Sequence, residues 1–192
     1  MQYSLEEKYN RIKSEIVNIK SANPIEVVKE MMHRDCIAIH GPEHHFLDGA
    51  ALLTAYYNAG GNIDLRGCLD ALAERSIKMP GAMCAYWGVC GSVASVGAVF
   101  SIIHDTQPLS GDEYYKDNLQ LTSTILSKMS KIGGPRCCKR NAFLSLSYAV
   151  DFIREKYGVE MTLNRVICEF SPLNKQCIGD KCPFFAKTRQ NA

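Results

Sequence analysis

Three cysteines near the end of the chain have the residue types and the setting of a metal site. Cys168, Cys177 and Cys182 lie in CEFSPLNKQCIGDKCPFF, a loop-like stretch with little helical periodicity. Three soft ligands on a flexible loop can converge on one metal centre, whereas a regular helix would point them in different directions. Pro183 directly follows Cys182, as is common at iron–sulfur clusters. The stretch therefore predicts an iron–sulfur cluster or a zinc ion.

The spacing of these cysteines leaves two questions open. It matches neither the bacterial ferredoxin run nor a zinc ribbon, so the alternative is three buried cysteines in an aromatic tail. Three ligands also leave a four-coordinate site one ligand short, unless the fourth position is open to substrate. We expect the fourth ligand to come from PGAMCAYWGVCGSVASVG or from GGPRCC, which contain Cys84, Cys90, Cys137 and Cys138.

A second group of reactive side chains stands where two helices are expected to begin, each after a Gly-Pro pair. It comprises the polar residues of HGPEHH and the thiols of GGPRCC: His40, Glu43, His44, His45, Cys137 and Cys138. The unpaired N–H groups of a helix N-terminus favour neutral imidazoles, which bind metals, and thiolates, which bind metals or attack electrophiles. We therefore expect catalytic or metal-binding roles here, and we expect His44 and Cys137 to line one pocket.

Other roles for the same residues stay open. The histidines could cap or pack their own helix. The His-x-x-Glu-His pattern of inverted zinc peptidases is also present, although the Gly-Pro pair leaves His40 outside the helix and breaks the one-turn spacing. Cys137 and Cys138 could form a vicinal disulfide that acts as a redox switch. Cys68 fits the apolar face of its helix and is expected to pack there.

The elements that position these residues are predicted to be helices. Ser4 and Glu7 form a capping box that opens an amphipathic helix over 4–20, and Asn23 opens a second helix that runs to about 32. Further helices are expected after 41, after 64, over 112–131 and over 135–157, and glycines end several of them. NRVICEF at 164–170 is the one candidate strand. The fold class is therefore mostly α.

The segment 82–103 contains no charged residue and is long enough to span a bilayer. Because it is rich in Gly, Ser and Cys rather than Leu, and has no basic flank, we expect a buried helix instead. The predicted architecture is a single-domain helical bundle around this Gly/Ser/Cys-rich central helix, with a Cys-rich C-terminal loop segment. Residues 1–22 would form an amphipathic helix that docks on the body or pairs with a second copy as a homodimer, and residues 23–192 the Cys/His-rich helical domain.

Composition limits the class of protein. A chain of 192 residues with 46% apolar and 22% charged residues is ordinary for one globular domain. The net charge of +2 argues against nucleic acid or an anionic membrane as partner. The charged N-terminus lacks the apolar core of a signal peptide, so a cytoplasmic location is expected. There the nine cysteines would be metal ligands, redox groups or buried side chains rather than disulfides.

Four blocks of sequence carry most of these features: MHRDCIAIHGPEHHFLDGAALLTAYYNAGG, PGAMCAYWGVCGSVASVGAVFSI, GGPRCCKRNAFLSL and CEFSPLNKQCIGDKCPFF. Together they resemble an uncharacterised Cys/His-rich domain-of-unknown-function family of anaerobic archaea and bacteria, over roughly residues 28–185. That resemblance implies no activity, but it implies a methyltransferase-like or redox protein as a partner. The chain itself has no glycine-rich nucleotide-binding turn after a strand, so it would be a companion of such a methyltransferase.

The leading interpretation is a cytoplasmic protein that binds an iron–sulfur cluster or zinc and has a redox or metal-dependent catalytic site at helix N-termini. One alternative is a non-catalytic interaction module stapled by zinc. Another is a metal-free thiol redox protein that works through Cys137 and Cys138. Neither a nucleic acid nor a membrane is expected as a partner.

Overall fold

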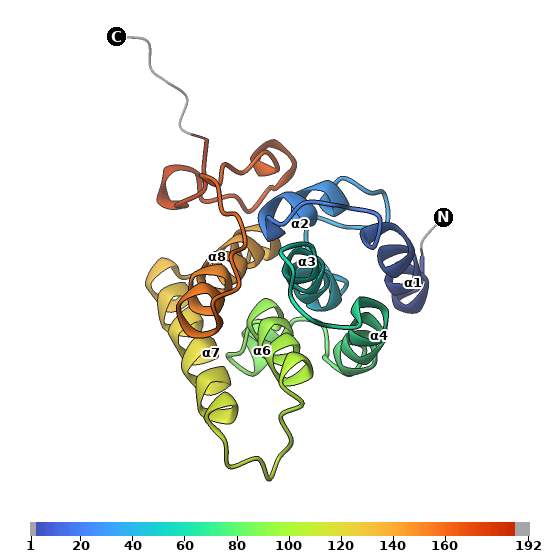
Figure 1. The fold of residues 1–192 in the computed structure, drawn as a ribbon. Coiled ribbons are helices and arrows are strands. Elements are labelled where there is room, and N and C mark those ends of the chain that lie inside the picture. The colour runs from blue at the N-terminus through green and yellow to red at the C-terminus, as the bar shows by residue number, and fades with distance from the viewer. Residues whose placement is uncertain (1–2, 187–192) are drawn as a thin grey trace.

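The computed structural model describes residues 3–186, and this part of the chain is a single helical domain (Figure 1). The helices are α1 Leu5–Ile16, α2 Pro24–Met32, α3 His44–Asn58, α4 Leu65–Ser76, α5 Met83–Tyr86, α6 Gly91–Ile103, α7 Glu113–Ile132 and α8 Cys138–Tyr157. Two 3-10 turns follow, Ser171–Leu173 and Gly179–Lys181. Within 3–186 there is no strand, only an isolated bridge between Cys168 and Phe185, so the candidate strand at 164–170 is not formed. The mostly α fold is confirmed.

Local capping explains where several helices begin. The Ser4 hydroxyl accepts a hydrogen bond from the Glu7 amide, and the Glu7 carboxylate accepts one from the Ser4 amide, so the predicted capping box is present. Asn23 accepts from the amide of Ile25 at 2.9 Å at the start of α2, and Asp112 caps α7. These side chains satisfy N–H groups that the helices themselves leave unpaired.

Helix α3 occupies the centre of the domain. Almost every residue from His44 to Tyr56 is buried, and α1, α2, α4, α6 and α8 all pack against it (Figure 1). A helix that is apolar on all sides can be stable only when neighbours cover every face. The helix therefore carries its few polar residues, including Asp48, into the interior.

The predicted helix over 82–103 is wrong in its first half. Residues 83–86 form the short α5, a turn follows, and the buried helix α6 begins only at Gly91. Tyr86 and Trp87 are 77% and 61% exposed, and Ala82 and Gly88 have positive φ angles of 62° and 68°. The absence of charge in this segment did not mean burial, because the glycines let the chain turn before α6. None of the helices described is long and apolar enough to cross a membrane.

Helix α1 packs on the body through its apolar stripe. Tyr9, Ile12 and Ile16 are buried, and the Tyr9 ring lies 4.7 Å from that of Phe46 in α3. The helix ends at Ile16, earlier than the predicted residue 20. Docking against the body accounts for the amphipathic pattern, and pairing with a second copy stays a prediction.

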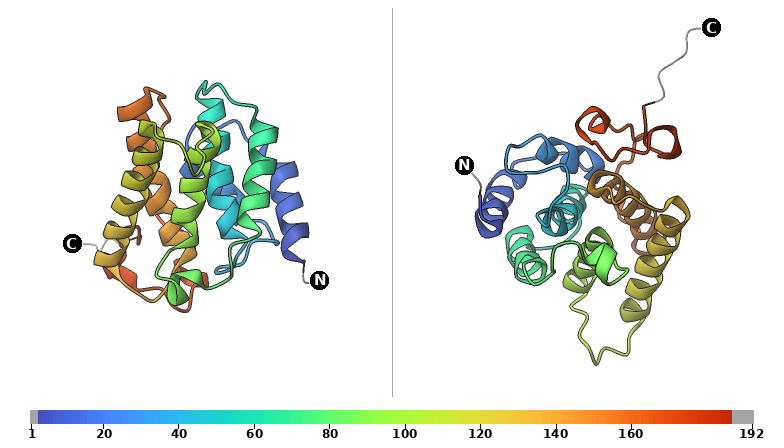
Figure 2. Two further views of the ribbon diagram at one scale, coloured as in Figure 1. Left: turned by 90° about the horizontal axis from the view of Figure 1, so that it is seen from below. Right: turned by 180° about the vertical axis from the view of Figure 1, so that it is seen from behind.

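The segment after α8 is irregular and lies across α8 and α2 (Figure 1). Phe170 is buried, the Phe184 ring lies 5.7 Å from that of Phe143, and Lys29 in α2 pairs with Glu169 at 2.9 Å. These contacts hold the cysteine-rich loop on the domain. Helices α3, α6 and α8 begin at the same end of the bundle, close to this loop (Figure 2).

Close packing of α3 on α6 gives the first prediction. A Cβ at Gly49 would lie 2.5 Å from the Ser95 hydroxyl and 2.9 Å from a methyl carbon of Leu72. Gly49→Ala should therefore lower the free energy of unfolding by about 1–3 kcal/mol, the usual effect of overpacking, despite the better helix propensity of alanine. Gly111→Ala, where no atom lies within 4 Å, is the matched control. Urea unfolding that shows both variants equally stable would contradict this packing.

Candidate functional site

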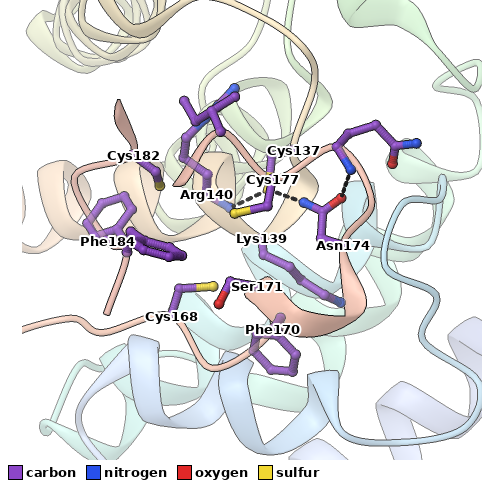
Figure 3. Close-up of a pocket in the computed structure, with 13 residues that line it drawn as sticks. Cys137, Lys139, Arg140, Cys168, Phe170, Ser171, Asn174, Cys177, Cys182 and Phe184 are labelled. Carbon is purple, nitrogen blue, oxygen red and sulfur yellow. Dashed lines mark hydrogen bonds between the residues drawn. The ribbon is translucent and has the colours of Figure 1, made fainter. Parts of the chain in front are cut away.

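Four cysteines from two distant parts of the chain line one cavity. Cys168, Cys177 and Cys182 come from the C-terminal loop, and Cys137 comes from the start of α8 (Figure 3). We call this space the tail cavity. The space free of protein atoms is about 400 Å³ when the part open to solvent is included, and the centre of a water molecule can occupy about 20 Å³ of it. The three predicted ligands are thus brought together, and the structure places Cys137 beside them.

Backbone hydrogen bonds fix the cysteines around the tail cavity. The Cys168 amide donates to the Phe184 carbonyl at 2.7 Å, which joins the two ends of the loop. The Cys177 and Cys182 amides donate within tight turns, to the carbonyls of Asn174 and Gly179. Cys137 is the N-cap of α8, and its sulfur accepts from the Arg140 amide at 3.4 Å. The four thiols therefore stand on an ordered framework.

Asn174 connects the C-terminal loop to the residues just before α3 and α8 by polar contacts. It is 7% exposed, its amide nitrogen donates to the Cys137 sulfur at 3.5 Å, and its oxygen accepts from the Gln176 amide at 3.0 Å. The same oxygen lies 3.0 Å from Nε2 of His40. The sequence analysis missed Asn174, because nothing in the loop sequence distinguishes this residue from an exposed turn asparagine.

Two buried cations line the tail cavity. Lys139 is 1% exposed and Arg140 is 5% exposed. The Lys139 amine donates to the Ala38 carbonyl at 2.9 Å, and the Arg140 guanidinium donates to the carbonyls of Gly133 and Pro135, both at 2.9 Å. Within residues 3–186 neither cation forms an ion pair with a carboxylate. Positive charge is therefore concentrated beside the four thiols.

Burial governs protonation around the tail cavity. It lowers the pKa of Lys139 to about 8, although Asp48 and the nearby thiols act in the opposite direction. It raises the pKa of the Cys168 and Cys182 thiols above the ordinary cysteine value. Without a cation or an electrophile in the cavity, these two thiols keep their protons at neutral pH.

A second cavity lies where α3, α6 and α8 begin, and we call it the helix-start cavity. It contains about 820 Å³ free of protein atoms, and the centre of a water molecule can occupy about 290 Å³. Its reactive lining residues come from four segments: His40, His44, His45, Asp48, Cys84, Cys90, Arg136 and Cys138. Thus Cys84 and Cys90, two candidates for the fourth ligand, lie in a cavity different from that of the tail cysteines.

The two cavities are separated by the first turn of α8. Cys137 lines the tail cavity and Cys138 the helix-start cavity, so the adjacent thiols face different spaces and form no disulfide. The two helix starts are indeed side by side, because Nζ of Lys139 lies 3.1 Å from Nε2 of His44. It is Cys138, however, that shares a cavity with His44. The expected pairing of His44 with Cys137 is therefore wrong by one residue.

His44, which contacts Lys139, also pairs with the buried Asp48 of α3. Nδ1 of His44 lies 3.4 Å from Oδ1 of Asp48, one helical turn further on. Asp48, His44 and Lys139 consequently form a continuous row of polar groups from the helix-start cavity to the tail cavity.

Glu43 lines neither cavity. Its carboxylate accepts from the Ala38 amide at 2.8 Å and pairs with Lys8 at 3.2 Å. Gly41 permits this arrangement, since a Cβ there would collide with the Glu43 carboxylate. The structure thus gives Glu43 a role in fixing the loop before α3.

The expectation of an activated thiol at the start of α8 does not hold for Cys138. Burial raises the pKa of its thiol to about 12, against the opposing effect of the Gly41 amide. The effect of the helix N-terminus on the pKa of this thiol is therefore smaller than the effect of burial. For the histidines the expectation of a neutral form does hold at His40 and His45, whose pKa values burial lowers. Among residues 3–186, no three His, Cys, Asp or Glu side chains converge closely enough to hold a single metal ion.

The lowered pKa of His45 predicts a pH dependence of stability. Its pKa lies below the value of about 6.5 expected for the unfolded chain, so the unfolded state binds more protons as the solution is acidified. The stability from burying neutral His45 is full above about pH 6.5 and is lost as the pH falls through the folded pKa. Urea unfolding of metal-stripped protein near pH 7.5 and near pH 5.5 should show a smaller loss for His45→Gln than for the wild type. An equal loss of stability in the two proteins would mean that the His45 side chain is exposed to water in the folded state.

Comparison with known proteins gives a family but no function. No curated protein and no solved structure matches the chain. The model of a family of unknown function, DUF5714, matches residues 12–185, which include every residue of both cavities. The chain therefore belongs to the DUF5714 family.

Proposed function

We propose that this protein binds an iron–sulfur cluster in the tail cavity, through Cys137, Cys168, Cys177 and Cys182, and that the cluster gives it a redox function. The observation that carries the proposal is the placement of four thiols beside two buried cations, neither of which forms an ion pair with a carboxylate among residues 3–186.

Lys139 and Arg140 are both buried. Taking an ion out of water is costly unless an opposite charge or strong hydrogen bonds replace the water. Arg140 is bound by carbonyl groups, and Lys139 lies 3.1 Å from His44, which in turn lies 3.4 Å from Asp48. Four thiolates ligating a cluster carry net negative charge, and they would sit directly against both cations. Lys139 and Arg140 thus fit an anionic occupant of the tail cavity.

The arrangement of the thiols favours a cluster over a zinc ion. A zinc ion draws four sulfurs to about 2.3 Å from one point. Here the four cysteines surround a cavity, and in a cluster such as [4Fe–4S] each thiolate binds a different iron. Cys182 is followed by Pro183, another feature of cluster sites. A non-catalytic zinc staple is the alternative that metal analysis would reveal.

A cytoplasmic location and a redox partner are part of this proposal. Reduced thiols are needed to assemble the site, and the cytoplasm supplies that condition. The cluster exchanges single electrons, so a partner must deliver or accept them. A methyltransferase-like protein of an anaerobic organism is one such companion, as the sequence resemblance implies.

Removing ligands tests the proposal. Cys137→Ser and Cys182→Ser should each lose most of the bound iron and acid-labile sulfide, together with the visible absorption of protein purified without oxygen. Cys68→Ser is the matched control, because Cys68 is also partly buried but lines neither cavity. Iron and sulfide that remain at the wild-type level in both site variants would exclude this ligand set. Zinc in place of iron, lost from both variants, would show a zinc site.

A second test uses Lys139. In metal-free protein Lys139→Met removes a buried charge with no ion-pair partner, so the free energy of unfolding should be unchanged or higher. In loaded protein the same substitution removes a compensating cation, and the cluster should be lost faster on exposure to a chelator. Lys8→Met, which removes a cation that lines neither cavity, is the control. Strong destabilisation of the metal-free variant with no change in cluster loss would mean that Lys139 is purely structural.

A further inference from the structure

Three thiols that the tail cavity does not use face the helix-start cavity. Cys84 comes from α5, Cys90 is the N-cap of α6, and Cys138 is the first residue of α8. Thiolates bind soft and borderline metals such as zinc more readily than they bind hard cations. Three of them around one space, next to imidazole and carboxylate groups, are a metal-binding donor set.

Two buried polar atoms at this cavity have no hydrogen-bond partner within residues 3–186. They are Oδ2 of Asp48, whose side chain is fully buried, and Nδ1 of His45, which is 8% exposed. A buried polar atom without a partner is costly, and a carboxylate oxygen especially so. Oδ2 of Asp48 is a lone-pair donor, and Nδ1 of His45 is one in the neutral tautomer that carries its hydrogen on Nε2. A bound metal cation would satisfy them together.

The helix starts hold these donors in place. A Cβ at Gly91 would collide with the His45 ring, so the glycine lets the imidazole lie against the first turn of α6. The Asn141 amide donates to the Cys90 sulfur at 3.2 Å, and the Ser92 hydroxyl donates to the Asn141 carbonyl at 3.3 Å. These hydrogen bonds therefore connect the starts of α6 and α8 beside the thiols. In metal sites, hydrogen bonds to the ligands orient them in the same way.

We propose that the helix-start cavity is a second metal centre, for one divalent ion of the zinc type, held by Cys90, Cys138, His45 and Asp48. The donors line separate walls and do not yet converge, so binding requires the two thiols to turn inward and to release their protons to solvent. The cavity has room for this rotation. The proposal does not rest on the cluster in the tail cavity.

Cobalt(II) is the probe, because it replaces zinc and shows sulfur-to-cobalt charge-transfer absorption when thiolates bind it. The titration is made in the full-length Cys168→Ser/Cys182→Ser protein, so that the tail cavity cannot contribute two of its thiols. One equivalent of cobalt should bind with charge-transfer bands. Adding Cys90→Ser or Cys138→Ser should weaken binding at least about tenfold and reduce the bands, and Asp48→Asn should weaken binding with the bands kept.

The controls separate this proposal from the cluster. Cys68→Ser in the same background should bind cobalt unchanged. Circular dichroism shows whether the background protein folds. If it does not fold, the second ion is measured in cluster-loaded protein instead, as zinc found in addition to the iron, with and without Asp48→Asn. Absence of charge-transfer bands or of excess zinc, or a signal indifferent to Cys90, Cys138 and Asp48, would overturn the second centre. Whether the variants of the tail cavity lose or keep their iron does not affect this test of the second metal centre.

Discussion

The contact between Lys139 and His44 is the interaction on which the arrangement of both cavities depends. The amine lies 3.1 Å from Nε2 of His44 and donates to the Ala38 carbonyl, so it joins the start of α8 to the loop before α3 across about a hundred residues of chain. It is buried on all sides. Apolar packing holds α3 and α8 together, and this polar contact specifies how their starts lie against each other in the wall between the two cavities.

The residues at the start of α8 contribute side chains to both cavities. Cys137, the extended N-cap, lines the tail cavity together with Lys139 and Arg140, whereas Cys138, the first helical residue, lines the helix-start cavity. One short stretch thus supplies a ligand and two cations to one cavity and a thiol to the other.

The sequence predicted the fold well because the signals for helices are local. Capping residues such as Ser4, Asn23 and Asp112, and the glycine after α8, act on their own neighbours, and these boundaries agree with the structure. Loop segments were harder. Residues 82–90 look like part of a buried helix by composition, yet their glycines and the αL conformation of Ala82 make a turn with exposed aromatic residues.

The candidate sites depend on long-range placement, which a single sequence does not encode locally. The three tail cysteines could be grouped because they share one loop, but choosing Cys137 over its neighbours required knowing the residue at which α8 begins. Nothing in the sequence marks Lys139, Arg140 or Asn174 as buried. Their burial follows from how the loop folds back on the bundle.

The most direct test of the central claim is X-ray diffraction from crystals of anaerobically prepared protein, with anomalous data collected at the iron absorption edge. We expect iron density in the tail cavity, bonded to the sulfurs of Cys137, Cys168, Cys177 and Cys182 and adjacent to Lys139 and Arg140. Protein that contains iron by analysis but shows no anomalous density among these four sulfurs, or shows it bound elsewhere, would contradict the account.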